Sequence, residues 1–298
     1  MIGGIKLEVG LLDVDGKSPN IALMKISAWH KQQGDKVYWY AGEFEHPDRV
    51  YASKVFTFTP DHQYPLEGVE VIKGGTGYDI KGKLPDCIDC ICPDYSLYPD
   101  MNASMGFLTR GCPNKCPWCF VPEKEGDIHP YMDIDDFCRH EQVTLMDNNV
   151  LASEHGIHQI EKIGKMDIAI DFNQGLDARL VDDTIAKLLS KVKWFAPIRL
   201  ACDTVSQMKH VQKAVETLRW YNVKPFKGQY SCYVLIRPGE IDDALQRIRF
   251  LKGIGVDPFV QPYQPPGGRE IPKEEADLAR YCNMKATFKG CWWENYKG

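Results

Sequence analysis

Residues 106–122 read GFLTRGCPNKCPWCFVP. The first four of them, 106–109, fit a short strand, and the loop that follows places Cys112, Cys116 and Cys119 at C-x3-C-x2-C spacing. Three thiolates from one short loop can bind three irons of a [4Fe-4S] cluster, because thiolate is the usual ligand of such clusters. The fourth iron then has no partner in the loop, and an open coordination position is typical of catalytic metal sites.

This strand begins a regular alternation of strand-like and helical segments. Further strands are expected at 142–147, 167–172, 197–202, 230–236 and 256–261. Apolar residues recur at helical spacing over 205–219 and 241–251, and a last helix is expected over 273–283. The pattern gives about six strand–helix units, fewer than the eight of a closed TIM barrel. It predicts an α/β fold with a partial (β/α)6 TIM-type barrel over residues 99–298.

Residues 1–98 predict a smaller Rossmann-like unit with a parallel sheet and a linker. Its strands are expected at 5–12, 37–40, 50–57 and 69–72, and its helix at 21–33. Ser18 is the expected cap of this helix, with Pro19 in its first turn and Gly34 at its end. The stretch 81–101, rich in Pro, Asp and Cys, is expected to link the two units.

Composition excludes several classes of protein. The chain has 298 residues, of which 44% are hydrophobic and 26% charged, as in ordinary globular proteins. No apolar run approaches the ~18 residues that cross a bilayer, and the N-terminus does not resemble a signal peptide. We therefore expect a cytoplasmic protein that does not associate with membranes. A net charge of -5 argues against broad binding to phosphate backbones.

The cysteine loop resembles that of the radical S-adenosylmethionine superfamily. The resemblance rests on the C-x3-C spacing, on Trp118 before the third cysteine, and on the place of the loop after the first strand of a partial barrel. It covers roughly residues 103–290. The unit before it resembles the cobalamin-binding-like domain of many members, whose Asp-x-His-x-x-Gly loop supplies a histidine to cobalt. Here residues 13–18 read DVDGKS, with Asp15 at the histidine position, so cobalamin binding is not expected.

The resemblance implies a reaction and its cofactors. A [4Fe-4S] cluster on Cys112, Cys116 and Cys119 would reductively cleave S-adenosylmethionine to a 5'-deoxyadenosyl radical, which abstracts hydrogen from an unidentified substrate. The electron would come from a donor such as flavodoxin or ferredoxin. Strand ends should hold the cofactor, with Trp118 near the adenine and Arg237 near the methionine carboxylate. The other candidates at strand ends are Asn148, Asn149, Gln174, Arg179, Asp203 and Gln261.

Other interpretations of the same residues stay open. Cys112, Cys116 and Cys119 could hold zinc with His129 or Cys138, in a metal-stabilised module that binds nucleic acid or protein without turnover. A second trio, Cys87, Cys90 and Cys92, could hold an auxiliary cluster or could be incidental. The charged run 123–126 is expected to be solvated, although it follows the cysteine loop and could close over it.

Overall fold

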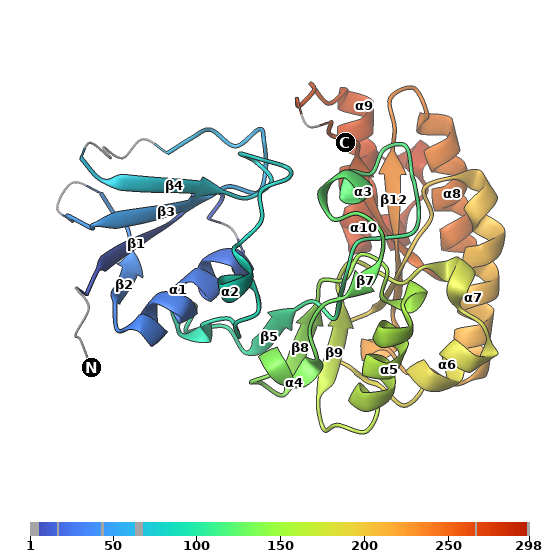
Figure 1. The fold of residues 1–298 in the computed structure, drawn as a ribbon. Coiled ribbons are helices and arrows are strands. Elements are labelled where there is room, and N and C mark those ends of the chain that lie inside the picture. The colour runs from blue at the N-terminus through green and yellow to red at the C-terminus, as the bar shows by residue number, and fades with distance from the viewer. Residues whose placement is uncertain (1–5, 17, 43–44, 63–67, 266, 297–298) are drawn as a thin grey trace.

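The computed structural model describes residues 6–296, with gaps at 17, 43–44, 63–67 and 266. The chain forms two α/β units joined by the segment around α2 (Asp86–Asp89) (Figure 1). The smaller unit has an all-parallel sheet in the order β2–β1–β3–β4. Its strands are β1 (Glu8–Asp13), β2 (Lys36–Trp39), β3 (Arg49–Ser53) and β4 (Glu70–Gly74). The expected parallel sheet is confirmed, with strand ends displaced by a few residues.

The helix of this unit, α1 (Ile21–Gln33), begins at a different cap from the one expected. Asn20, rather than Ser18, accepts a hydrogen bond from the Leu23 N–H at 3.2 Å. The Asn20 amide also donates to Ser53 Oγ at 2.9 Å, which ties the helix start to β3. Ser18 lies before Pro19 and outside the first turn of the helix, so Asn20 rather than Ser18 is the capping residue. Gly34 ends the helix at φ 87°, as expected for a left-handed cap.

The larger unit contains parallel strands in two ladders. One has the order β10–β9–β8–β5, and the other has the order β11–β12–β13. A parallel bridge between Leu176 and Leu200 connects the two. The strands are β5 (Ala103–Gly106), β8 (Gln142–Leu145), β9 (Ala169–Phe172), β10 (Lys193–Trp194), β11 (Ile198–Ala201), β12 (Tyr230–Ile236) and β13 (Asp257–Pro262).

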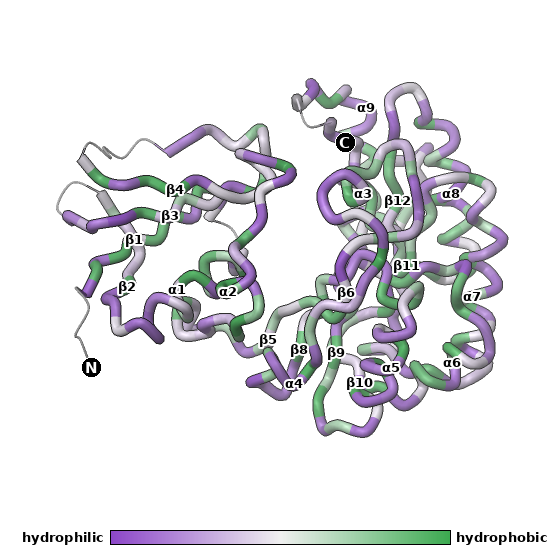
Figure 2. Tube along the Cα trace, in the orientation of Figure 1, coloured by the Kyte–Doolittle hydropathy of each residue, from purple (hydrophilic) through white to green (hydrophobic). Residues whose placement is uncertain are grey.

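Helices cover one face of these strands, and that face is apolar (Figure 2). They are α4 (Ile134–Phe137), α5 (Glu154–Ile163), α6 (Asp183–Leu189), α7 (Met208–Trp220), α8 (Ile241–Gly253), α9 (Lys273–Asn283) and α10 (Lys285–Gly290). Alternate strand residues such as Ile170, Ile198 and Val234 are fully buried beneath them. The expected helices at 241–251 and 273–283 are confirmed, and the first of them extends to Gly253. Among the described residues, no helix has the length and apolar character needed to cross a membrane.

The first strand of the larger unit ends three residues earlier than expected. It covers 103–106 rather than 106–109. A Cβ on Gly106 would lie 2.5 Å from the Phe137 ring, so this position packs directly against α4. After it, the N–H groups of Leu108 and Thr109 turn to the Asp147 carboxylate instead of a neighbouring strand. Thr109 and Arg110 then form a separate short strand, β6, which pairs with β7 (His129–Pro130).

The expected linker contains structure that joins the two units. It forms α2 (Asp86–Asp89) and the short 3-10 helix η1 (Tyr95–Leu97). Lys25 on α1 is only 2% exposed, and its ammonium donates to the Asp89 carbonyl and, at 2.7 Å, to the Tyr131 hydroxyl of the larger unit. Burial lowers the pKa of Lys25. One buried cation therefore connects α1, the linker and the larger unit.

Candidate functional site

The cysteine loop starts from a narrow hairpin at the carboxyl ends of the strands. Its two arms are β6 and β7, and the Cys112 N–H donates to the Gly126 carbonyl at 3.2 Å. Gly111 has φ 79°, and a Cβ there would lie 2.3 Å from the Asp127 carbonyl oxygen. Only glycine fits this close approach of the two arms. Within the loop, the Cys119 N–H donates to the Cys116 carbonyl at 3.0 Å, so the last two cysteines share one turn.

Glu125 holds this hairpin to the next strand end. Its carboxylate accepts from the Gly111 N–H at 2.9 Å, from the Arg110 guanidinium at 2.7 Å and from the Asn148 amide at 2.8 Å. The side chain is 9% exposed, so the expected solvation of the run 123–126 is wrong at this residue. Its neighbour Lys124 is also engaged, since it donates to Thr76 of the smaller unit at 2.5 Å. Asn148 therefore supports the loop through Glu125.

A second carboxylate, that of Asp177, connects the cysteine loop to two other strand ends. It accepts from Asn114, between the first two cysteines, at 3.1 Å and from Asn149, after β8, at 3.2 Å. Arg179 binds it in bidentate fashion at 2.8 and 2.6 Å. The Asn149 amide also lies 3.7 Å from Cys112 Sγ. The structure thus brings together Cys112, Asn149 and Arg179, three of the residues expected at the site.

Trp118 and Arg237 also meet. The Arg237 guanidinium carbon lies 4.5 Å from the centre of the Trp118 ring, a cation–π arrangement. Arg237 also pairs with Glu240 at 2.5 Å, and its Nε is buried without a hydrogen-bond partner among the described residues. The loop after β12 therefore packs on the cysteine loop. The buried Nε leaves one donor available to a ligand.

The environment of the thiols opposes their ionisation. Burial, reinforced by the neighbouring cysteines, raises the pKa of both Cys116 and Cys119. The positive charge of Arg179 acts against this effect at Cys116. Thiolates in such surroundings need cationic partners, and iron or zinc would supply them.

The three thiols of the loop do not converge on one metal ion. In the described parts of the chain, no three His, Cys, Asp or Glu side chains are placed to hold one metal ion. A [4Fe-4S] cluster has a different requirement, because each thiolate binds its own iron and the sulfurs lie further apart. Asn149 Oδ1, beside Cys112, is buried and lacks a hydrogen-bond partner within the described structure. An unpartnered acceptor here fits a bound amino group, so the residues present are compatible with both implied cofactors.

Three expected site residues make no hydrogen bond to the cysteine loop. Asp203 is largely buried and accepts from the Leu235 N–H at 3.0 Å, and burial raises its pKa. Its carboxylate lies near enough to the loop to raise the pKa of Cys116 and Cys119, and the charges of Arg247 and Arg237 act on it in turn. Gln174 and Gln261 are exposed, and neither side chain makes a hydrogen bond with the described residues.

The structure adds residues that the sequence did not single out. Asp171 and Arg199 form an ion pair on the face of β9 and β11 opposite the apolar core. Tyr233 on β12 donates to the Asn173 carbonyl at 2.5 Å on the same side. Their signal in the sequence was a polar residue between buried apolar neighbours in a strand, as in Ile170-Asp171-Phe172. On this face Arg199 and Tyr233 are partly exposed, whereas Asp171 is buried.

The remaining cysteine and cobalamin predictions have structural counterparts. Asp15 accepts from the Val55 N–H and, at 2.6 Å, from the Thr59 hydroxyl, so its carboxylate organises the loop after β3. Cys87 and Cys90 are exposed, whereas Cys92 is half-buried against the core of the larger unit. The expectation that cobalamin does not bind stays a prediction.

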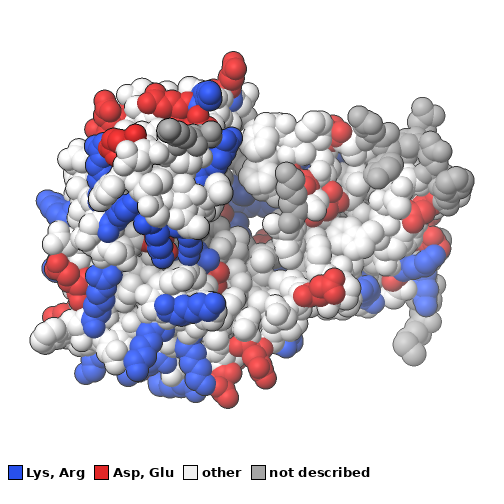
Figure 3. All heavy atoms as spheres, turned by 180° about the vertical axis from the view of Figure 1, so that it is seen from behind, with Lys and Arg blue, Asp and Glu red and all other residues white. Residues whose placement is uncertain are grey.

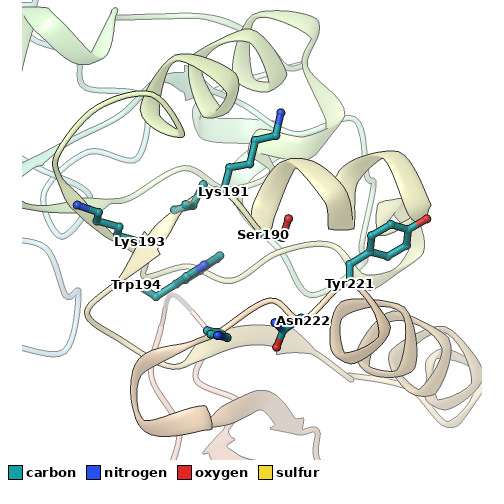
Figure 4. A pocket seen from close by; sticks show the side chains of 8 residues that line it. Ser190, Lys191, Lys193, Trp194, Tyr221 and Asn222 are labelled. Atoms are coloured by element: carbon teal, nitrogen blue, oxygen red, sulfur yellow. The ribbon is translucent and has the colours of Figure 1, made fainter.

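One surface hollow lies away from the cysteine loop. It has a volume of about 560 Å³ and is lined by residues 190–194, 221–222 and 224 (Figure 4). In Figure 4, Trp194 borders it while the Lys191 side chain points away. These residues follow α6 and α7 and include the short strand β10, so they lie near the amino ends of the strands, opposite the cysteines. We assign this hollow no role in the chemistry, because barrel enzymes carry their active sites at the carboxyl ends.

Comparison with known proteins adds no family assignment. A scan of protein-family models and a search of curated proteins find no match for this chain. The candidate site therefore rests on its own chemistry and geometry.

Proposed function

We propose that this protein is a radical S-adenosylmethionine enzyme with a [4Fe-4S] cluster on Cys112, Cys116 and Cys119. The observation that carries the proposal is the arrangement of these three thiols in one loop, tied by Asp177 and Glu125 to the ends of β8 and β9. Three thiols without a fourth local ligand suit a cluster with one open iron.

The proposal includes a partial (β/α)6 barrel for the larger unit. The parallel strands that support it are β5, β8 and β9 in one group and β11, β12 and β13 in the other, with the Leu176–Leu200 bridge between the groups. The two-residue strand β10 pairs with β9 and is not counted among the six. Helices lie on the outer, apolar side of these strands, and the polar pair Asp171–Arg199 lies on the other side. The cysteine loop stands at the carboxyl ends, where barrel enzymes carry their active sites.

The cluster, when bound, supplies the electron that cleaves S-adenosylmethionine. The protein's own residues do the binding and orientation. Asn149 offers a buried acceptor to a ligand amino group, and Arg237 offers a buried donor to a carboxylate. Trp118, stacked on Arg237, restricts water at this end of the loop. The electron would come from a donor such as flavodoxin or ferredoxin, and the substrate would approach the Asp171–Arg199 face.

The test is an anaerobic assay for 5'-deoxyadenosine with a strong reductant. The native protein should contain iron and sulfide, absorb broadly in the visible range and form 5'-deoxyadenosine. The triple variant Cys112→Ala, Cys116→Ala, Cys119→Ala should lose all three properties while remaining folded. Cys138→Ala is the matched control and should keep them. A colourless native protein that binds one zinc, with zinc lost in Cys138→Ala, would refute the proposal.

One observation favours the second candidate, a metal-stabilised binding module. Residues 181–298 contain 19 Lys and Arg against 13 Asp and Glu, although the whole chain is acidic. Basic side chains gather on the rear face of the larger unit (Figure 3). Several are neutralised, since Lys285 and Lys289 both pair with Asp257. A binding module would show affinity for RNA that falls steeply with salt and is unchanged by reductant or S-adenosylmethionine.

A further inference from the structure

Cys87 and Cys90 lie at the two ends of one helical turn in the segment that joins the units. Both are exposed, and the Cys90 N–H donates to the Asp86 carbonyl at 3.2 Å. Helical geometry separates Cα atoms three residues apart by roughly 5 Å. Disulfides form at Cα separations of about 4.4–6.8 Å. Cys90 Sγ also lies 3.9 Å from the Cys87 carbonyl oxygen, so it already points back along the turn.

The third cysteine of this cluster is in different surroundings. Cys92 is half-buried, its Sγ lies 3.7 Å from the Pro93 carbonyl, and it packs against the core of the larger unit. Burial raises the pKa of its thiol. Cys92 is therefore a poor partner for either exposed cysteine, and the structure separates the trio into an accessible pair and a packed single residue.

A buried cation lies beside the pair. The Lys25 ammonium donates to the carbonyl of Asp89, the residue before Cys90, and lies 3.4 Å from its carboxylate. The attacking species in thiol–disulfide exchange is a thiolate, and the exposed positions of Cys87 and Cys90 leave both sulfurs accessible to a small disulfide.

We propose that Cys87 and Cys90 form a redox-active dithiol that exchanges with low-molecular-weight disulfides. The Cys90 thiolate attacks one sulfur of the small disulfide, which forms a mixed disulfide and releases one small thiol. The Cys87 thiolate then attacks Cys90 Sγ and releases the second small thiol. Two protein thiols are oxidised, and one small disulfide is reduced to two thiols.

Oxidation of Cys87 and Cys90 would affect the contact between the two units, because the pair lies in the segment that joins them. Between the two cysteines, Ile88 is buried in the core of the smaller unit, and Asp89 accepts a hydrogen bond from Tyr131 of the larger unit at 2.6 Å. A disulfide would fix this turn covalently. The redox state of the cell would then act on the junction between the units, independently of any cluster at the cysteine loop.

The experiment uses the full-length, reduced protein and oxidised glutathione, followed by N-ethylmaleimide and trypsin. Cleavage after Lys83 and Arg110 gives a peptide, 84–110, that contains Cys87, Cys90 and Cys92 and no other cysteine. This peptide should lose the mass of two hydrogen atoms and take up one maleimide, on Cys92. The pair should react about tenfold faster than Cys92.

Two variants make the outcome decisive. Cys92→Ser should still form the internal disulfide, while Cys87→Ser should stop at a glutathione adduct on Cys90. Full labelling of all three cysteines after oxidation would overturn the proposal. So would a disulfide that includes Cys92, or a tightly bound metal that protects the three thiols from maleimide. Because the readout does not depend on 5'-deoxyadenosine, its result is separate from that of the proposed enzyme activity.

Discussion

Asp147 presents a direct competition between burial and hydrogen bonding. The residue is 3% exposed, and its carboxylate accepts from the N–H groups of Leu108 and Thr109 and from the Thr109 hydroxyl, the last at 2.7 Å. Hydrogen bonds to a carboxylate favour its charged form, whereas burial disfavours it. Burial has the larger effect here and raises the pKa of Asp147 to about 6. Asp147→Asn replaces the carboxylate by a neutral group of the same shape.

The sign of the pH effect follows from this raised pKa. The folded protein holds a proton on Asp147 more tightly than the unfolded chain, so this residue stabilises the fold most at low pH. That contribution is lost as the pH rises through about 4 to about 6. A shift of about two pKa units corresponds to about 3 kcal/mol. The free energy of unfolding of the native protein, relative to Asp147→Asn, should therefore fall by about 3 kcal/mol between about pH 4 and about pH 7.

The measurement is urea unfolding of both proteins across this range, followed by tryptophan fluorescence under reducing conditions. Taking the difference between the two proteins cancels the titration of every other group. A difference that rises with pH would mean that the hydrogen bonds outweigh burial and that the pKa is lowered. A difference that stays flat would mean that Asp147 does not titrate on folding. Either result would refute the reasoning.

Three further predictions concern other contacts. Lys25→Met should lower the free energy of unfolding in a urea titration by about 1–3 kcal/mol, because the buried hydrogen bonds of Lys25 to the linker and to the larger unit are lost. Lys31→Met, which removes an exposed ion pair on the same helix, should lower it by less than about 1 kcal/mol. Asp177→Ala should speed the release of iron to a chelator by about tenfold with little change in melting temperature, because it frees two side chains that hold the cysteine loop; an unchanged rate of release would contradict this. Asn283→Ala should promote concentration-dependent self-association in sedimentation experiments, because the Asn283 side chain hydrogen-bonds both the N–H and the carbonyl of Val260 on strand β13 and so prevents another strand from pairing there. A variant with the same sedimentation behaviour as the native protein would exclude this role.

Local patterns in the sequence predicted the elements well but not the contacts between them. The helix at 273–283 and the strand at 230–236 match the structure because their apolar periodicity is strong and uninterrupted. The strand at 142–147 was expected two residues too long. Asp147 looked like its last residue, but its carboxylate bonds to a segment 38 and 39 positions earlier. No local pattern contains such a bond.

In the candidate site, too, local features could be predicted from the sequence and contacts between distant segments could not. Cysteine spacing is a local property, so Cys112, Cys116 and Cys119 could be identified directly from the chain. Glu125 and Asp177 hold the loop because particular strand ends lie side by side, and only the folded structure shows this. The strand-end rule therefore named Asn149 and Arg237, which contact the loop, together with Gln174 and Gln261, which are exposed and make no hydrogen bond with the described residues.

The buried position of Lys25 has a consequence for how the chain is made. Lys25 leaves the ribosome 106 residues before Tyr131, the partner that completes its burial. Until Tyr131 is made, the Lys25 ammonium stays hydrated. The smaller unit can then fold only with the Lys25 side of α1 exposed to water. Removing water from a charged group costs free energy, and this cost is met only when the larger unit supplies hydrogen-bond partners for Lys25. The packing of the two units against each other is therefore a late step in synthesis. A nascent chain that stops before residue 131 should hold a folded smaller unit with Lys25 still open to amine-modifying reagents.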